Sequence, residues 1–177
     1  PDQIPLPLKR ALEAKGYAEL TPVQSAMLEP DTAGADLLVS AQTGSGKTVA
    51  FGMAIADTLL AGKDTLGMAV QPMALVVAPT RELALQVRRE LEWLYADAGA
   101  KMASCVGGME MRKEIRALQQ GAHIVVGTPG RLRDHLERGV LDIKALSCST
   151  KQMKCSTSVF AKTSSSSLMP HRRNAAR

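Results

Sequence analysis

The chain has 177 residues, 45% of them hydrophobic, which suffices for one domain with a sizeable core. Its net charge of +5 belongs to one end: residues 147–177 hold six Lys or Arg and no acid, whereas residues 1–146 hold 16 basic and 17 acidic residues. With no apolar run near the roughly 20 residues of a membrane span and only three cysteines, membrane-spanning and disulfide-stapled classes are excluded, and a soluble, cytoplasmic monomer is predicted.

Two short helices are predicted near the N-terminus. The apolar residues of LPLKRALEAK recur at helical spacing, and Gly16 follows as a C-terminal stop. In TPVQSAML, Thr21, Pro22 and Gln24 occupy the cap, first and third positions, which is the capping-box pattern.

Short apolar runs then alternate with longer helical segments. Helices are expected to begin near Gly46, Arg81, Glu110 and Gly130. Such alternation predicts an α/β fold, a mostly parallel sheet with crossover helices on both faces and ligands beyond the carboxyl ends of its strands. The expected strands lie in DLLVSA (36–41), ALVVAPT (74–80), KMASCV (101–106) and HIVVGT (123–128).

The segment GVLDIKALS (139–147) resembles a turn that leads toward one more strand. The residues after it are rich in Ser, Thr and Lys and lack an apolar period. No further strand is therefore expected, and residues 147–177 are expected to be disordered or loosely packed.

The stretch AQTGSGKT (41–48) lies between a predicted strand and a predicted helix, as a phosphate-binding loop requires. Its glycines let consecutive N–H groups and the helix N-terminus face one anion, Lys47 can reach the outer phosphates, and Thr48 can offer a hydroxyl to Mg²⁺. The alternative is a Gly-rich turn with a solvated lysine, which the flanking elements disfavour. The predicted nucleotide contacts are Thr43, Gly44, Ser45, Gly46, Lys47 and Thr48.

Cysteines and histidines show no spacing typical of metal ligands. The cysteines are Cys105, Cys148 and Cys155, and the histidines are His123, His135 and His171. No zinc site is predicted.

Four further stretches occur in a fixed order around that loop: GYAELTPVQ (16–24), PTRELA (79–84), Gly107–Gly108 and TPGR (128–131). Together with AQTGSGKT they resemble the first, RecA-like domain of a DEAD-box RNA helicase over residues 16–146. The resemblance implies ATP or ADP with Mg²⁺, RNA held by its backbone, and a second RecA-like domain that is not in this sequence. A P-loop kinase or transporter ATPase would leave PTRELA and TPGR unexplained.

The resemblance also implies roles for single residues. Gln24 matches the glutamine that reads adenine, a role compatible with its capping box because the cap fixes the helix that presents the amide. Tyr17, in the same motif, is assigned to the nucleotide site, whereas Trp93 and Tyr95 are predicted to pack in the interior. The RNA-backbone contacts implied are Pro79, Thr80, Arg81, Gly107, Gly108, Thr128, Pro129, Gly130 and Arg131; taken singly, several of these also suit helix caps and turns.

A DEAD-box domain is expected to continue after GVLDIKALS into a strand ending in Asp-Glu-Ala-Asp, which is absent here. Joining the third base of each codon to the first two of the next, with GC-rich wobble bases, converts Leu146–Ser164 into VVLDEADEMLDLGFREDL. Two bases of each new codon are fixed by the residues present, so wobble freedom cannot create this sequence. Residues 147–177 are therefore interpreted as out-of-frame translation; the alternative is a genuine Ser/Lys-rich linker.

The prediction is thus an incomplete RecA-like nucleotide-binding domain over residues 1–146 with an aberrant tail over residues 147–177. Such a chain is expected to bind ATP or ADP and, weakly, RNA backbone. Without the leading acids of the Asp-Glu-Ala-Asp motif, it has no assigned catalytic residue and is expected to be inactive in hydrolysis and unwinding. The alternative is a non-catalytic module that binds RNA or a partner through its basic tail.

Overall fold

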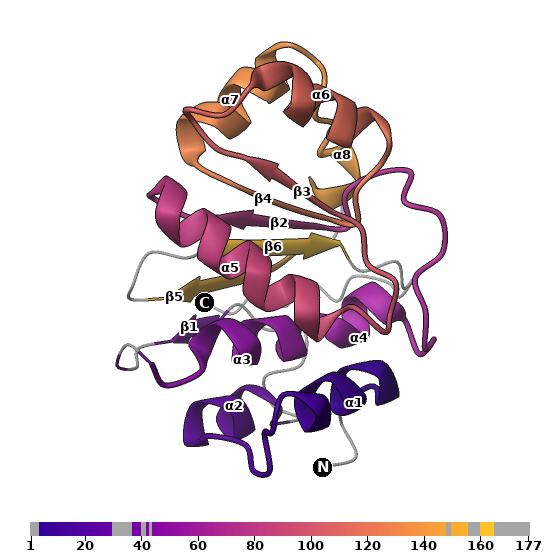
Figure 1. Ribbon diagram of the computed structural model, residues 1–177, viewed down its shortest axis with the longest axis vertical. Helices are drawn as coiled ribbons and strands as arrows, with labels where there is room; N and C mark the ends of the chain where they lie inside the picture. Colours follow the sequence, from indigo (N-terminus) through magenta and orange to yellow (C-terminus); the bar gives the residue numbers. More distant parts are fainter. Residues whose placement is uncertain are drawn as a thin grey trace, which may run out of the picture.

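The computed structural model describes residues 4–29, 37–39, 42, 44–147, 150–155 and 160–164, and within them six strands form one sheet (Figure 1). The strand order is β1-β5-β6-β2-β4-β3. The strands are β1 (Leu37–Val39), β2 (Ala74–Val77), β3 (Met102–Cys105), β4 (Ile124–Gly127), β5 (Thr150–Cys155) and β6 (Phe160–Ser164). The pairs β1–β5, β2–β4 and β3–β4 are parallel, whereas β5–β6 and β2–β6 are antiparallel.

Helices cover both faces of this sheet, as predicted. In Figure 1, α3 and α5 lie against one face with α1 and α2 outside them, and α6 and α7 lie on the other. The helices are α1 (Leu6–Ala14), α2 (Pro22–Met27), α3 (Lys47–Ala54), α4 (Ala56–Leu60), α5 (Arg81–Leu94), α6 (Met111–Gln119), α7 (Pro129–Glu137) and α8 (Lys144–Ser147).

Alternation along the strands divides the core into two clusters. Ala74 and Val76 of β2 belong to the cluster that α3 and α5 cover, whereas Leu75 faces the cluster that α6 and α7 cover. This is the two-residue period of a strand buried on both sides. Both clusters therefore depend on β2 and its neighbour β4.

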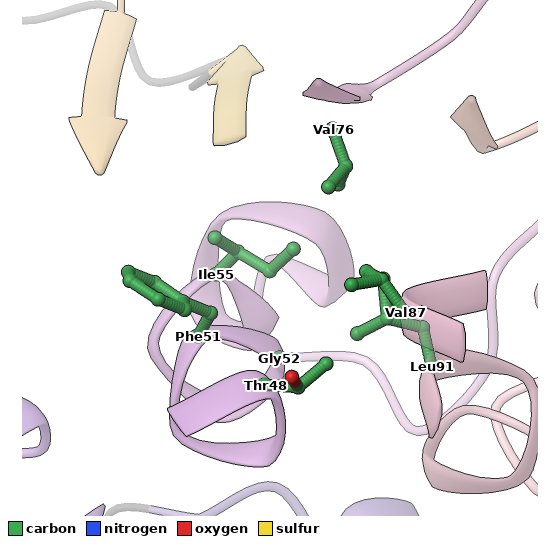
Figure 2. A pocket seen from close by; sticks show the side chains of 7 residues that line it. All are labelled: Thr48, Phe51, Gly52, Ile55, Val76, Val87 and Leu91. Carbon is green, nitrogen blue, oxygen red and sulfur yellow. The ribbon is translucent and has the colours of Figure 1, made fainter. Parts of the chain in front are cut away.

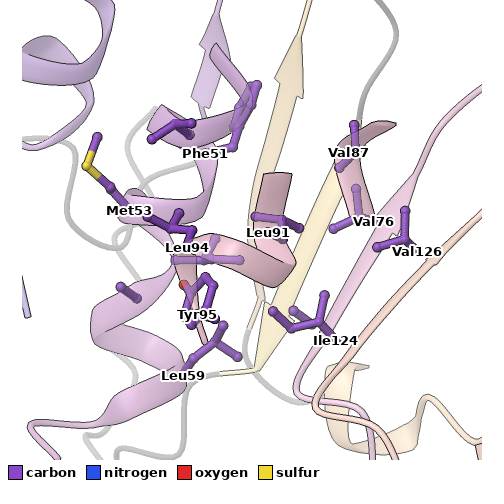
Figure 3. Close-up of a cluster of buried hydrophobic side chains, with 14 of the residues drawn as sticks. Phe51, Met53, Leu59, Val76, Val87, Leu91, Leu94, Tyr95, Ile124 and Val126 are labelled. Carbon is purple, nitrogen blue, oxygen red and sulfur yellow. The ribbon is translucent and has the colours of Figure 1, made fainter. Parts of the chain in front are cut away.

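The first cluster is closed by a contact between α3 and the end of α5 (Figure 3). Tyr95 is fully buried, as predicted, and its hydroxyl donates a hydrogen bond of 2.6 Å to the carbonyl of Gly52. A Cβ at Gly52 would lie 2.4 Å from Leu94, so the two helices approach closely only because position 52 has no side chain.

Two expectations differ from the structure. The single helix expected from Gly46 is interrupted at Ile55, after which α4 begins. The prediction that no strand follows GVLDIKALS is wrong, because β5 and β6 occupy the sheet between β1 and β2. Backbone pairing explains this, since a ladder needs N–H and C=O groups and no particular side chains.

Among the described residues, even the longest helix, α5 with 14 residues, falls short of the length and apolarity that crossing a bilayer demands.

His123, the residue before β4, connects Lys101 to the segment that precedes β2 through its two ring nitrogens. The Lys101 N–H donates to its Nδ1 at 2.9 Å, so Nε2 carries the proton and donates to the Gly67 carbonyl at 3.1 Å. Burial lowers the pKa of His123 from its usual 6.5, because the charged ring would lose water and its acceptor nitrogen.

This geometry predicts a pH dependence of stability. The folded pKa of His123 is the lower one, so its contribution is complete above pH 6.5, the unfolded value, and is lost as pH falls through the folded pKa. The free energy of unfolding should therefore fall below about pH 6.5. In His123→Ala, stability at pH 7 should drop by about 1–3 kcal/mol and that acid-side slope should weaken. Denaturant unfolding at several pH values measures both, with His171→Ala as the control; an unchanged slope in His123→Ala would contradict the assignment.

Candidate functional site

Four of the five sequence motifs lie in loops that follow the carboxyl ends of strands running in one direction, whereas GYAELTPVQ (16–24) lies between α1 and α2 and at the start of α2. β2, β3 and β4 are mutually parallel, and β1 shares their direction because β5 and β6 contribute two antiparallel pairings between them. The loops after these four strands therefore lie at one edge of the sheet, the edge where ligands bind in open α/β folds.

The Gly44–Thr48 part of the predicted phosphate-binding loop depends on two glycines for its backbone conformation. Gly44 and Gly46 have φ of 84° and 80°, the left-handed region that glycine adopts without a Cβ penalty. The hydroxyl of Ser45 is shielded from solvent and has no hydrogen-bond partner within the described part of the chain. An orphaned donor beside the first turn of α3 fits an oxyanion ligand. Thr43 lies outside the described residues.

Lys47, the first residue of α3, donates its ammonium to the Gln42 carbonyl in this structure. The loop thus satisfies the lysine internally, and a phosphate would compete with a backbone carbonyl for it. Thr48, next along α3, is half-buried.

The capping box predicted at Thr21 and Gln24 is present, and it also holds the phosphate loop. The Thr21 N–H donates to Gln24 Oε1 at 2.9 Å, and Gln24 Nε2 donates to the Gly46 carbonyl at 3.4 Å. The Thr21 hydroxyl donates to the Ser45 carbonyl at 3.0 Å. Gln24 is fully buried, so its amide faces the backbone of the loop, and its contact with adenine stays a prediction.

Tyr17 packs against the Trp93 ring of α5 in this structure, and its assignment to the nucleotide site stays a prediction. Its ring stacks on Trp93 with centroids 5.8 Å apart, and Lys15 Nζ lies 5.5 Å from the centre of the Trp93 ring. Trp93 stands near the C-terminal end of α5, about 20 Å along the helix from its start at the carboxyl edge. The structure therefore places Tyr17 in an aromatic contact between α5 and the segment after α1, which sequence reasoning missed because it joins residues far apart in the chain.

The residues predicted to contact RNA come together from three loops. Arg81 reaches from the start of α5 and donates to the Gly107 carbonyl at 3.4 Å. Gly108 has φ of 78°, and a Cβ there would lie 2.6 Å from the Arg81 guanidinium. Thr80 caps α5 by accepting from the Leu83 N–H at 3.3 Å. The exposed members of the predicted set are Pro79, Thr80, Arg81, Gly107, Gly108, Pro129 and Gly130, whereas Thr128 is half-buried.

Arg131, the last residue of that set, points inward. Its side chain is 15% exposed, forms an ion pair of 3.3 Å with Glu114, and donates at 3.0 Å to the carbonyl of Met109. Its contact with RNA stays a prediction. In this structure its side chain links Glu114 to the carbonyl of Met109.

Glu114 was missed by sequence reasoning. It is 3% exposed; Oε1 accepts from the Val106 N–H at 3.0 Å, and Oε2 accepts from His135 Nε2 at 2.7 Å. The signal was present, because helical spacing puts Glu114 on the face of α6 that carries Ala117 and Leu118, and an acid on an apolar face needs buried partners.

Cys105, Glu114 and His135 also place one possible ligand atom each within 4.8 Å of one another. Burial, with the Glu114 carboxylate as the second cause, raises the pKa of Cys105 to about 12, so the thiol stays protonated. The Arg131 guanidinium already supplies the positive charge beside Glu114. The cluster therefore fits a hydrogen-bonded ion pair better than a metal centre.

An apolar cavity lies behind the first turns of α3 (Figure 2). Its walls come from α3, β2 and α5, and Thr48 contributes the one side-chain hydroxyl of the lining. It offers no row of donors to a phosphate, so it belongs to the core rather than to the ligand edge. The lining residues are Thr48, Phe51, Gly52, Ile55, Val76, Val87 and Leu91.

Comparisons with known proteins agree on one family. A sequence profile described as DEAD/DEAH box helicase matches residues 21–153. The chain is 42% identical over 136 residues to DEAD-box ATP-dependent RNA helicase 53 of Oryza sativa subsp. japonica, covering 76% of this chain and 22% of that protein. It is also 42% identical over 135 residues to DEAD-box ATP-dependent RNA helicase CshA of Geobacillus kaustophilus, covering 76% of this chain and 28% of that protein. The chain thus spans about a quarter of the length of these relatives.

Two solved structures share the fold. A yeast DEAD-box splicing factor has a TM-score of 0.68 and 31% identity, covering 79% of this chain and 34% of that one. A hypothetical ATP-dependent RNA helicase from Sulfolobus tokodaii has a TM-score of 0.64 and 35% identity, covering 77% of this chain and 38% of that one. The RecA-like α/β fold predicted from sequence is confirmed by these neighbours.

The contact between Gln24 and Gly46 predicts that replacing Gly46 by alanine destabilises the fold more than replacing Gly44. Both Gly44→Ala and Gly46→Ala place alanine at positive φ, which costs about 1–2 kcal/mol each. A Cβ at Gly44 meets open space, whereas one at Gly46 lies 2.6 Å from Gln24 Nε2. Gly46→Ala should therefore lower the free energy of unfolding further than Gly44→Ala.

Denaturant unfolding of both variants measures the difference, and the same pair in a Gln24→Ala background isolates its cause. Without the Gln24 amide, the extra cost at position 46 should disappear. An extra cost that persists in that background would show that another contact is responsible.

Proposed function

The chain belongs to the DEAD/DEAH box helicase family, and from this premise we propose that it binds ATP or ADP through Gly44–Thr48 and holds RNA backbone weakly at the same edge of the sheet. The observation that carries the proposal is the gathering of the motif loops at the carboxyl ends of strands that run in one direction. Those loops bring glycine backbones, hydroxyl groups and two arginines to a single edge.

Nucleotide binding would rest on three groups that the fold holds in place. The first N–H groups of α3 face the loop, Ser45 has an unsatisfied hydroxyl, and Lys47 can exchange the Gln42 carbonyl for a phosphate oxygen. Thr48 would hold Mg²⁺ together with the phosphates, and the ion would supply neutralising charge there. Gln24 would confer a preference for adenine if its amide turns from Gly46 toward the base.

RNA contact would use the exposed parts of the three other loops. Thr80 offers a hydroxyl, Arg81 a guanidinium, and Gly107 and Gly108 backbone N–H groups at a turn without side chains. These groups suit phosphate and 2′-OH and carry no code for bases. The proposed binding is therefore weak and independent of RNA sequence.

Hydrolysis and unwinding are not proposed for this chain alone. The segment after Leu146 reads SCSTKQM, so no acid stands where a DEAD-box domain carries Asp-Glu-Ala-Asp. Losing groups that hold the metal or orient the attacking water commonly costs ~10³-fold or more in rate. Out-of-frame origin of residues 147–177, a cytoplasmic location, the monomeric state and the need for a second RecA-like domain remain parts of the same proposal.

Substitution of the loop lysine tests the nucleotide site. Lys47→Ala should raise the Kd for ADP and ATP, because a charge-assisted hydrogen bond is worth about 1.5–3 kcal/mol, or roughly 10- to 150-fold in Kd. Titration calorimetry or anisotropy of a fluorescent ADP measures this. Lys63→Ala, at an exposed position after α4, is the matched control for the lost charge. Equal affinities of the two variants would remove Gly44–Thr48 as the nucleotide site.

A second candidate function is RNA association through the basic tail, which the six positive charges and absent acids of residues 147–177 favour. A chain that ends after residue 164 loses Arg172, Arg173 and Arg177 but keeps β5 and β6. If the folded edge alone binds RNA, this chain should retain both its affinity and its salt dependence, whereas tail arginines that contact phosphates would make the log–log slope shallower by about 2 when they are removed. Complete loss of binding in an RNA titration at several salt concentrations would favour the tail instead.

A further inference from the structure

The turn from Val106 to Met109, which follows β3, forms hydrogen bonds with three side chains from other elements. Glu114 of α6 accepts from the Val106 N–H, Arg81 of α5 donates to the Gly107 carbonyl, and Arg131 of α7 donates to the Met109 carbonyl. A turn with two adjacent glycines has few conformational restraints of its own, so these contacts set its shape.

Glu114 connects this turn to α7. Its carboxylate lies between the Val106 N–H, the Arg131 guanidinium and the His135 ring, at 3.0, 3.3 and 2.7 Å. The side chains of Glu114 and His135 are 2% and 0% exposed, so both are removed from water. A buried carboxylate is costly unless such partners satisfy it, and removing it leaves the Val106 N–H without its acceptor and Arg131 without its anion.

The consequence of losing Glu114 follows from that geometry. The buried Val106 N–H would lack an acceptor, and Arg131 would keep only its bond to Met109. An arginine without its anion tends to turn toward solvent. The turn would then lose two of its three hydrogen bonds to side chains, those to Glu114 and Arg131. The Gly107 and Gly108 backbone would sample other conformations.

We propose that Glu114 is a positioning residue for RNA: without touching RNA, it presets the Val106–Met109 turn and the Arg131 side chain for a single-stranded RNA backbone. This inference rests on the proposed binding of RNA at this edge. Preorganised loops bind more tightly because the ordering cost is met before the ligand arrives.

The sign of the effect separates positioning from simple electrostatics. Removing an acid near a site for a polyanion should strengthen binding if only charge matters. Loss of a positioning residue should weaken it. Glu110 provides the matched control, since it lies on the turn before α6, its side chain is 55% exposed, and it pairs only with Lys113 among the described residues.

The experiment compares the full chain with Glu114→Ala, Glu114→Gln and Glu110→Ala. Anisotropy of a fluorescent oligo-uridine at low salt reports RNA affinity, and a fluorescent ADP reports the phosphate loop. Glu114→Ala should weaken RNA binding roughly 10-fold while leaving ADP affinity unchanged. Glu114→Gln should fall between, because the amide oxygen still accepts from Val106 but carries no charge for Arg131. Glu110→Ala should bind RNA as tightly as the unmodified chain or more tightly.

RNA affinity in Glu114→Ala equal to or above that of Glu110→Ala, with ADP affinity retained, would overturn the proposal. If Glu114→Ala also loses ADP affinity, that variant has not folded correctly. The RNA affinity of Glu114→Gln is then compared with that of Glu110→Ala, and an affinity equal to or above that of Glu110→Ala overturns the proposal.

If the unmodified chain shows no affinity for RNA, the proposed function fails at that step, and hydrogen exchange judges the positioning role by itself. Amides of residues 106–109 should then exchange faster in Glu114→Gln than in Glu110→Ala. Equal exchange would overturn the role of Glu114.

Discussion

Parallel pairing of β2, β4 and β3 is the constraint on which the rest of the molecule depends. It brings the carboxyl ends of these strands to one edge and places β2 and β4 inside the sheet, where the apolar residues on both of their faces need helices on both sides. Arg81, Gly107 and Thr128, which are far apart in the chain, become neighbours for that reason. The same pairing sends the Thr128 N–H to the Cys105 carbonyl at 2.9 Å, which fixes the spacing of the last two loops.

At that edge, three polar side chains donate hydrogen bonds to nearby backbone carbonyls. Gln24 binds the Gly46 carbonyl, Lys47 the Gln42 carbonyl and Arg81 the Gly107 carbonyl. The Gln24 amide is shielded from water and needs a partner at all times, whereas Lys47 and Arg81 are also accessible to water and donate to carbonyls that a ligand can replace. Ligand binding at such a site is an exchange of partners, and its net free energy is smaller than the contacts themselves would indicate. The buried Glu114, by contrast, pairs with the Val106 N–H, Arg131 and His135, and its own carboxylate is removed from water.

Strand pairing tolerates many different side chains, whereas metal binding and water activation do not. β5 and β6 complete the sheet between β1 and β2 although their residues lack the apolar period of a buried strand. Pairing uses N–H and C=O groups that every residue except proline carries, so strands of many sequences can fill such a gap. Metal binding and water activation need carboxylates at fixed positions, and no backbone can substitute for them.

Local rules in the sequence determined much of this protein. The capping box at Thr21 and Gln24, the starts of α5 and α6 and the positions of β1 to β4 were predictable, because they depend on hydrogen bonds within a few residues and on apolar period. The order of the motifs determined the family. Tertiary structure alone decided which distant residues meet: Tyr17 with Trp93, Glu114 with His135, Gln24 with Gly46, and β5 and β6 with β1 and β2. Those contacts depend on how the elements pack against one another. The spacing of residues along one sequence does not show which distant elements will pack together.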